Sequence, residues 1–228
     1  MDQRSPEWFA ERMGRITSTS AKVIINPSAR PDSSATLMGE LVREIATGDY
    51  KDVPDTFWMR HGREQEPKAI AAYEMYTGVK VQDGGFHISD RHNLMGDSPD
   101  GVVGLFEGVV EAKCPSPEEH GRVLVQSAPK PEHRWQMAWH LMVSGALWCD
   151  YVSYCDEYPE HLKLFIKRYT LLDIWPDKII KGKIYKSKPD ISDKVITSAE
   201  QIGEAWGKIG NFIDTYQGHL QRLGLTLE

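Results

Sequence analysis

The hydrophobic and polar positions of this chain repeat with two different periods, one typical of strands and one typical of helices. Alternating or continuous apolar runs predict strands over 79–81, 85–89, 101–103, 108–110, 148–155 and 162–169. Apolar positions three and four apart, with capping residues and glycine stops, predict helices over 6–13, 21–25, 36–47, 62–77, 131–144 and 199–223. We therefore expect an α/β protein, taken as a single domain over 1–228, with a core at about 5–170 and a mostly helical part at about 171–228.

Composition and cysteine usage narrow the class of protein. The chain is that of a soluble globular protein with no membrane-spanning stretch and no signal peptide, so we expect a cytoplasmic location and no membrane partner. Its three cysteines are scattered, which is typical of a reducing compartment and is one short of a four-cysteine iron–sulfur site. The histidines show no zinc spacing, and His133 and His140, seven apart on one predicted helix, are interpreted as packing or surface residues.

Two acidic residues and a lysine form the most informative motif. The stretch Ser98-Pro99-Asp100-Gly101 is followed, ten residues later, by Glu111-Ala112-Lys113-Cys114. Cleavage of a phosphodiester uses hard divalent cations, which need carboxylate oxygens close together. A lysine ammonium beside them can orient or deprotonate the attacking water and offset charge on the phosphate. Because Glu111 and Lys113 are two apart on a predicted strand, both project from one face, and the spacing indicates a metal-dependent nuclease centre.

Hairpin geometry places Asp100 beside this pair. With a turn at 104–107, centred between Leu105 and Phe106, Asp100 lies opposite Glu111 on the neighbouring antiparallel strand. Facing residues bring their Cβ atoms to about 4.5–5.5 Å, which lets two carboxylates hold one cation. A plainer interpretation remains open: Pro-Asp-Gly is also an ordinary turn signal, and Glu-Ala-Lys could be the solvated side of an edge strand.

A third carboxylate, Glu66, shares the apolar face of the predicted helix 62–77. Pro67 directly after it predicts a place in the first turn of that helix, where a negative charge is favourable at the helix dipole. A role as a metal ligand is the alternative, because an unpaired carboxylate on an apolar face is costly. The inward stripe expected for this helix is Ile70, Tyr73 and Tyr76.

The net charge of −6 neither supports nor excludes binding to nucleic acid. Carboxylates gathered at a metal site are neutralised once cations bind, so the formal charge overstates repulsion there. Positive charge is concentrated locally, in a stretch that is interpreted as a solvated face rather than a contact that follows a DNA strand. Its lysines are Lys178, Lys181, Lys183, Lys186 and Lys188.

Taken together, the motifs resemble those of the lambda-phage-type alkaline exonucleases, or viral recombinase nucleases, of the restriction-endonuclease-like superfamily. The similarity extends over about Trp8 to Tyr154. The matching features, in order, are Gly14-Arg15-Ile16-Thr17, Gly62 with Glu66, Ser98-Pro99-Asp100-Gly101, Glu111-Ala112-Lys113-Cys114 and Gln136.

The resemblance implies a restriction-endonuclease-like core, with a central mixed sheet flanked by helices. It also implies digestion of the 5′-ended strand of double-stranded DNA to mononucleotides, which leaves a 3′ single strand for an annealing protein. Mg²⁺ would be the cofactor, with Mn²⁺ as a substitute and two ions per site. Family members form ring-shaped trimers around DNA, so a homotrimer is implied.

Roles for single residues follow from the same resemblance. The metal ligands would be Asp100, Glu111, Glu66 and the backbone carbonyl of Ala112, with Lys113 and Gln136 as further catalytic residues. The 5′-terminal phosphate would bind Arg12, Thr19 and Ser98, where a guanidinium and hydroxyls suit a dianion.

Some features depart from the family pattern or allow another interpretation. A second glutamine two residues after Gln136 is absent, because Ala138 stands there, and in the loop 26–34 only Arg30 is a candidate for a DNA contact. Arg12 could instead form a surface ion pair with Glu7 or Glu11. Two other functions stay open: a restriction- or repair-type endonuclease on the same fold, and a catalytically inactive DNA-binding subunit.

Overall fold

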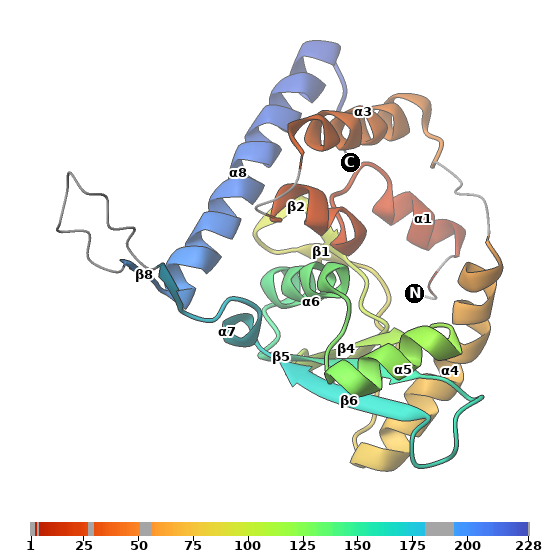
Figure 1. The fold of residues 1–228 in the computed structure, drawn as a ribbon. Coiled ribbons are helices and arrows are strands. Elements are labelled where there is room, and N and C mark those ends of the chain that lie inside the picture. Colours follow the sequence, from red (N-terminus) through yellow and green to blue (C-terminus); the bar gives the residue numbers. More distant parts are fainter. Residues whose placement is uncertain (1–2, 4, 27–29, 51–55, 181–193, 228) are drawn as a thin grey trace.

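The centre of the molecule is a four-stranded mixed sheet, shown in Figure 1 for the computed structural model of the chain. The residues that the structure describes are 3, 5–26, 30–50, 56–180 and 194–227. The strands, in spatial order, are β3 (Gly101–Val103), β4 (Gly108–Lys113), β5 (Trp148–Tyr154) and β6 (Leu164–Tyr169). β4 and β5 run parallel, and the other neighbouring pairs are antiparallel. Helices pack on both faces, so the predicted central mixed sheet flanked by helices is confirmed.

The two central strands are apolar on both faces, as expected for a parallel pair between helices. Val110, Ala112 and Val152 pack against the helix α4 (Phe57–Thr77). Val109, Cys149 and Tyr151 belong to the larger cluster, which includes the helix α6 (Pro131–Ser144). Because side chains alternate along a strand, Glu111 shares the face of Val109 and points towards α6.

A second layer covers α6 and joins the two ends of the described chain. It contains α1 (Pro6–Arg12), a 3₁₀ turn (Ser18–Ser20), α2 (Ala21–Ile24), α3 (Pro31–Thr47), the hairpin β1–β2 (His87–Ser89, His92–Asp97) and α8 (Ser198–Leu223). In Figure 1, α8 runs along this layer beside α3, and Tyr216 of α8 donates a hydrogen bond to the Gly14 carbonyl (3.0 Å). The other elements are α5 (Pro117–Gln126), α7 (Leu171–Ile174), β7 (Lys178–Ile180) and β8 (Lys194–Ile196). Across the described ranges, no helix has the length and apolarity that a bilayer span requires.

The start predicted for α4 is wrong. The helix begins at Phe57, where the Thr56 hydroxyl accepts the Met59 N–H, so Pro67 lies inside the helix rather than in its first turn. Proline is tolerated there because its ring faces solvent, where water can reach the carbonyl that loses its donor. Tyr76 is also misassigned to the inward stripe: it is 78% exposed, while Ala69, Ala72 and Tyr73 are buried.

Other helices and strands also differ from the predictions, where the local sequence signals were weak. The helix predicted to begin at residue 36 begins at Pro31, and residues 79–81 form no strand. The strand β2 and the helix α5 had not been predicted. The part beyond 172 is not wholly helical, because β7 and β8 pair before α8 begins. Of the lysine-rich segment only Lys178, in β7, lies within the described residues; Lys181, Lys183, Lys186 and Lys188 lie outside them.

Candidate active site

The β3–β4 hairpin sets Asp100 against Glu111. Gly101 pairs with Val110 and Val102 with Val109 around the turn at 104–107, which confirms the predicted register. Asp100 directly precedes β3, and its Oδ2 accepts the backbone N–H of Ala112 (2.7 Å). The carboxylate of Asp100 is thus held by a hydrogen bond from β4, the strand that also carries Glu111.

Lys113 completes this group from the same face of β4. Its ammonium is in direct contact with Glu111 Oε1 and lies 3.9 Å from Asp100 Oδ2. Burial disfavours its charge, but the carboxylates of Glu111 and Asp100 outweigh burial and raise the pKa of Lys113. The lysine therefore remains an ammonium ion and offsets the two carboxylates.

The two carboxyl groups titrate in opposite directions. Burial, together with the charge of Glu111, raises the pKa of Asp100 to about 8, although Lys113 opposes the shift. Burial acts against ionisation of Glu111 too, but Lys113 and a hydrogen bond from His140 lower its pKa. Glu111 is thus ionised, while Asp100 keeps its proton up to about pH 8.

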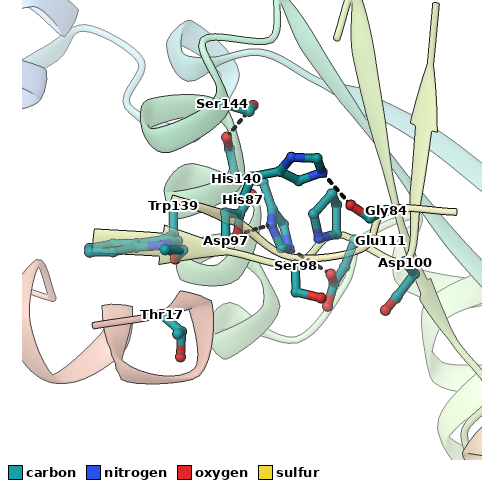
Figure 2. A network of polar contacts seen from close by, with 12 residues as sticks. Thr17, Gly84, His87, Asp97, Ser98, Asp100, Glu111, Trp139, His140 and Ser144 are labelled. Carbon is teal, nitrogen blue, oxygen red and sulfur yellow. Dashed lines mark hydrogen bonds and ion pairs between the residues drawn. The ribbon is translucent and has the colours of Figure 1, made fainter. Parts of the chain in front are cut away.

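His140 connects Glu111 to a further buried carboxylate, as Figure 2 shows. Its Nε2 lies 2.7 Å from Glu111 Oε2, and its Nδ1 lies 2.7 Å from Asp97 Oδ1. Burial disfavours a charged ring, but the charge of Asp97 and the two hydrogen bonds raise the pKa of His140 to about 10. The interpretation of His140 as a packing or surface residue is therefore incomplete, because it is buried against a predicted metal ligand.

Asp97 and His140 are the polar residues of this site that the sequence interpretation missed. A signal was present: a histidine inside the most apolar helix needs hydrogen-bonding partners. Asp97 ends β2, three residues before Asp100, and is fully buried. His133, by contrast, is half-buried and stacks on Tyr151 (5.7 Å between ring centroids).

Glu66 lies on α4, close to the carboxylate–lysine group. It lines one hollow together with Asp100 and a second one together with Ala112 and Lys113. Since α4 begins nine residues before it, the helix dipole does not account for this charge, because that effect falls off within the first turn. Its role as a direct metal ligand stays a prediction.

Arg12 is buried in a cluster of hydroxyl groups. Its guanidinium donates to Thr17 Oγ1 (3.0 Å), to Thr19 Oγ1 (3.1 Å) and to the Tyr50 hydroxyl (3.0 Å). With 9% of the residue exposed, it is not the surface ion-pair partner of Glu7 or Glu11 that the alternative required. Neither Thr17 nor Tyr50 had been predicted here, although the threonine belongs to a visible run of hydroxyl residues.

Ser98 joins this cluster to the carboxylates through Trp8. The Trp8 indole donates to Ser98 Oγ (3.1 Å), and the Arg12 guanidinium lies over the Trp8 ring, 4.8 Å from its centroid. Ser98 in turn donates to the Gly85 carbonyl (2.5 Å). The helix that follows this cluster, α2, has only four residues and no side-chain hydrogen bond at its N-cap, so its dipole contributes little there.

Two of the predicted site residues, Gln136 and Arg30, line other hollows. Gln136 is half-buried on α6 and lines a hollow with Thr19 and His133. Arg30 precedes α3, is exposed, and lines a different hollow beside α8. The structure therefore brings Gln136, but not Arg30, towards the hydroxyl cluster.

The donor set fits a divalent cation that completes its shell with other ligands. Glu111 Oε1 is buried and, among the described residues, has only the ion pair with Lys113. Over the same residues, no three His, Cys, Asp or Glu side chains converge closely enough to enclose a metal by themselves. Mg²⁺ is usually held by one or two carboxylates together with water and substrate phosphates, which matches a centre made of Asp100, Glu111 and the Ala112 carbonyl.

Comparison with known proteins identifies the family. The family described as "YqaJ-like viral recombinase domain" matches residues 7–147, which is more than half of the chain. No curated protein sequence matches the chain. The alkaline exonuclease LHK-Exo from Laribacter hongkongensis is 27% identical, with a TM-score of 0.76 and 96% of each chain covered. The same protein in complex with dAMP gives a TM-score of 0.75 at 27% identity and 96% coverage of each chain. A phage-related exonuclease from Haemophilus somnus 129PT shares the fold, with a TM-score of 0.62. It is 11% identical, and the match covers 92% of this chain and 96% of that chain. The chain thus belongs to the YqaJ-like viral recombinase domain family, and its fold is that of the alkaline exonucleases.

Proposed function

We propose that this protein is a Mg²⁺-dependent nuclease that digests double-stranded DNA from its ends in the 5′→3′ direction. The observation that carries the proposal is the group formed by Asp100, Glu111 and Lys113 at the β3–β4 hairpin. Membership of the recombinase family and the alkaline exonuclease fold support a DNA exonuclease. A full carboxylate–lysine group argues against an inactive DNA-binding subunit.

The residues at the hairpin would hold the cation and prepare the phosphodiester. Asp100 and Glu111, with the Ala112 carbonyl, would bind Mg²⁺, or Mn²⁺ in its place, and two ions are expected. When bound, such cations stabilise charge on the phosphate and lower the pKa of a coordinated water. Because the neighbouring carboxylates keep Lys113 protonated in the metal-free protein, we assign its ammonium to orienting the water and offsetting phosphate charge.

The Arg12 cluster supplies the direction of digestion. A buried guanidinium with the Thr17 and Thr19 hydroxyls is a charge-assisted donor set suited to a 5′-terminal phosphate. Gln136 lines the hollow beside Thr19, where the terminal nucleotide would lie. The solved complex of LHK-Exo with dAMP, a mononucleotide, is consistent with products of this size.

The mouth of the hollow beside Lys113 offers contacts for a strand end. Trp58 and Met59 line it and are 51% and 40% exposed, and Arg63 and Lys130 line it too. Aromatic faces that stack on bases, with nearby positive charge, are typical of sites that bind single strands. This surface favours a splayed duplex end as substrate. A homotrimer around DNA and an annealing protein that receives the 3′ strand complete the proposal.

One assay separates the proposal from its alternatives. Purified protein is incubated in Mg²⁺ with blunt linear duplex, with or without a 5′ phosphate, and with closed circular duplex. We expect digestion of the linear duplex to mononucleotides and an intact circle. Cutting of the circle would identify an endonuclease on this fold, and binding without any cutting would identify an inactive subunit.

A further inference from the structure

We infer that His140, held by Asp97, is a positioning residue that fixes the orientation of the metal ligand Glu111. The inference rests on the proposed function, in which Glu111 binds the cation. Asp97 and His140 act through the carboxylate of Glu111.

The geometry is a chain of three buried groups. One ring nitrogen of His140 lies 2.7 Å from Glu111 Oε2, and the other lies 2.7 Å from Asp97 Oδ1. The side chains of Asp97, His140 and Glu111 are 0%, 1% and 3% exposed, so water does not compete for these bonds. Glu111 Oε2 is thereby occupied, and Oε1 is left to face Lys113 and a cation.

Each member of the chain stands on a rigid element. Asp97 ends β2, Glu111 lies within β4, and His140 lies within α6, as Figure 2 shows. The neighbouring Trp139 ties α6 to β2, because its indole donates to the Gly96 carbonyl (2.9 Å). The imidazole is therefore fixed between two strands and cannot follow Glu111 if that side chain rotates.

Glu111 needs such a fixed partner because its side chain has three rotatable bonds. Without His140, Oε2 would be buried without a donor, which is costly, and the carboxylate would turn towards Lys113. A ligand whose outer partner is removed typically loses about 10- to 100-fold in metal affinity or activity. The histidine thus selects the rotamer in which one oxygen of Glu111 is free for metal.

A second buried histidine offers a matched control. His120, on α5, is fully buried and makes two hydrogen bonds of 2.8 Å, to Ser153 Oγ and to the Leu162 carbonyl. It is buried like His140 and makes the same number of hydrogen bonds, but neither of these two partners is a carboxylate. Its loss should therefore lower stability without affecting the metal centre.

The test compares His140→Ala, His140→Gln and Asp97→Asn with His120→Ala. Mn²⁺ affinity is measured by calorimetry on each folded protein, alongside thermal unfolding and kcat on linear duplex. For His140→Ala we expect Mn²⁺ affinity to fall about 10- to 100-fold. His140→Gln, which keeps one donor for Glu111, should recover part of the loss, and Asp97→Asn should show a smaller loss. His120→Ala should lose thermal stability and keep wild-type Mn²⁺ affinity.

Several outcomes would overturn the inference. Wild-type Mn²⁺ affinity in folded His140→Ala would do so, as would a loss no larger than that of His120→Ala. Should His140→Ala fail to fold, unchanged affinity in both His140→Gln and Asp97→Asn would have the same meaning. A wild-type protein that binds Mn²⁺ but digests no duplex would contradict the proposed function alone, because the affinities still decide the role of His140.

Discussion

The ammonium of Lys113 lies 3.9 Å from Asp100 Oδ2 while it is in direct contact with Glu111. One positive charge therefore lies beside two carboxylates, one just before β3 and one within β4, and Glu66 adds a third acidic group nearby. Once Asp100 is ionised, the one ammonium offsets only part of this negative charge, so the group would attract a cation. Each of the following predictions tests a part of this arrangement.

Replacing either carboxylate at the hairpin should abolish hydrolysis. We expect Asp100→Asn and Glu111→Gln to reduce kcat in Mg²⁺ by about three orders of magnitude or more, since Lewis-acid catalysis supplies several kcal/mol. Circular dichroism and a duplex-end binding assay should stay close to wild type. Asp150→Asn is the control, because Asp150 is buried and paired with Arg168 and Tyr73 away from the site. Near wild-type turnover in either hairpin variant would show that the metal centre lies elsewhere.

Lys113→Ala should separate metal binding from turnover. The ammonium neutralises the carboxylates and is expected to stabilise charge on the phosphate, so kcat should fall by orders of magnitude. Metal affinity should be largely kept, because removal of a positive charge does not weaken the attraction of the carboxylates for a cation. Lys68→Ala, which removes a surface lysine paired with Asp156, is the control. A large loss of metal binding in Lys113→Ala would instead make this lysine a structural residue.

Metal affinity should depend on pH through Asp100. Its pKa is raised from 3.8 to about 8 in the folded, metal-free protein, and only the ionised carboxylate binds a cation. Apparent Mn²⁺ affinity should therefore rise by about tenfold per pH unit up to about pH 8 and then level off. The metal-free protein should lose stability between about pH 4 and 8, since a carboxyl with a raised pKa stabilises the fold only while protonated. Calorimetry across this range tests both points, and an affinity independent of pH would exclude Asp100 as the controlling group.

The Arg12 cluster should make digestion sensitive to the 5′ end. We expect 5′-phosphorylated duplex to be digested faster than 5′-hydroxyl duplex by roughly 10- to 100-fold, which corresponds to one or two charge-assisted hydrogen bonds. Arg12→Ala should remove most of this difference, and Thr19→Val should remove part of it. The hydroxyl substrate is the control, because a general loss of DNA affinity would slow both substrates alike. A preference that survives in Arg12→Ala would place the phosphate elsewhere.

The homotrimer that the family resemblance implies is tested by measuring the mass of the protein in solution. Analytical ultracentrifugation should give three times the 25.9 kDa of one chain if the protein forms the ring that processive digestion requires. Addition of a hairpin-capped duplex without free ends should leave this mass unchanged. A monomer at assay concentration would remove the topological basis for processive digestion and favour the endonuclease alternative.

The facing pair at the hairpin could be predicted because local rules determine it. A four-residue turn and the two-residue period of strands leave one register for Asp100 and Glu111, and the structure has that register. The start of α4 could not be found in this way. Phe57 and Trp58 at its beginning are exposed, so the first turns carry no apolar periodicity, and Pro67 gave a misleading start signal.

The contacts of His140 could not be predicted from sequence patterns, for a different reason. Asp97 and Glu111 are 43 and 29 residues away from it in sequence, and α6 brings it to them only after packing on the sheet. The same holds for Trp8 and Ser98, which are 90 residues apart. Residue types show that such groups need partners, whereas the partners themselves depend on tertiary packing.

The bond between Trp8 and Ser98 has a consequence for the size of the product. Ser98 is two residues from Asp100, and Trp8 supports the Arg12 guanidinium, so the proposed anchor for the 5′ end and the proposed cutting centre are joined through packed side chains. In the proposed reaction, the distance between them is therefore set by the packing of Arg12 on Trp8, by the Trp8–Ser98 hydrogen bond and by the two-residue step from Ser98 to Asp100. An enzyme built in this way would release fragments of one length at every step, whatever the sequence of the strand.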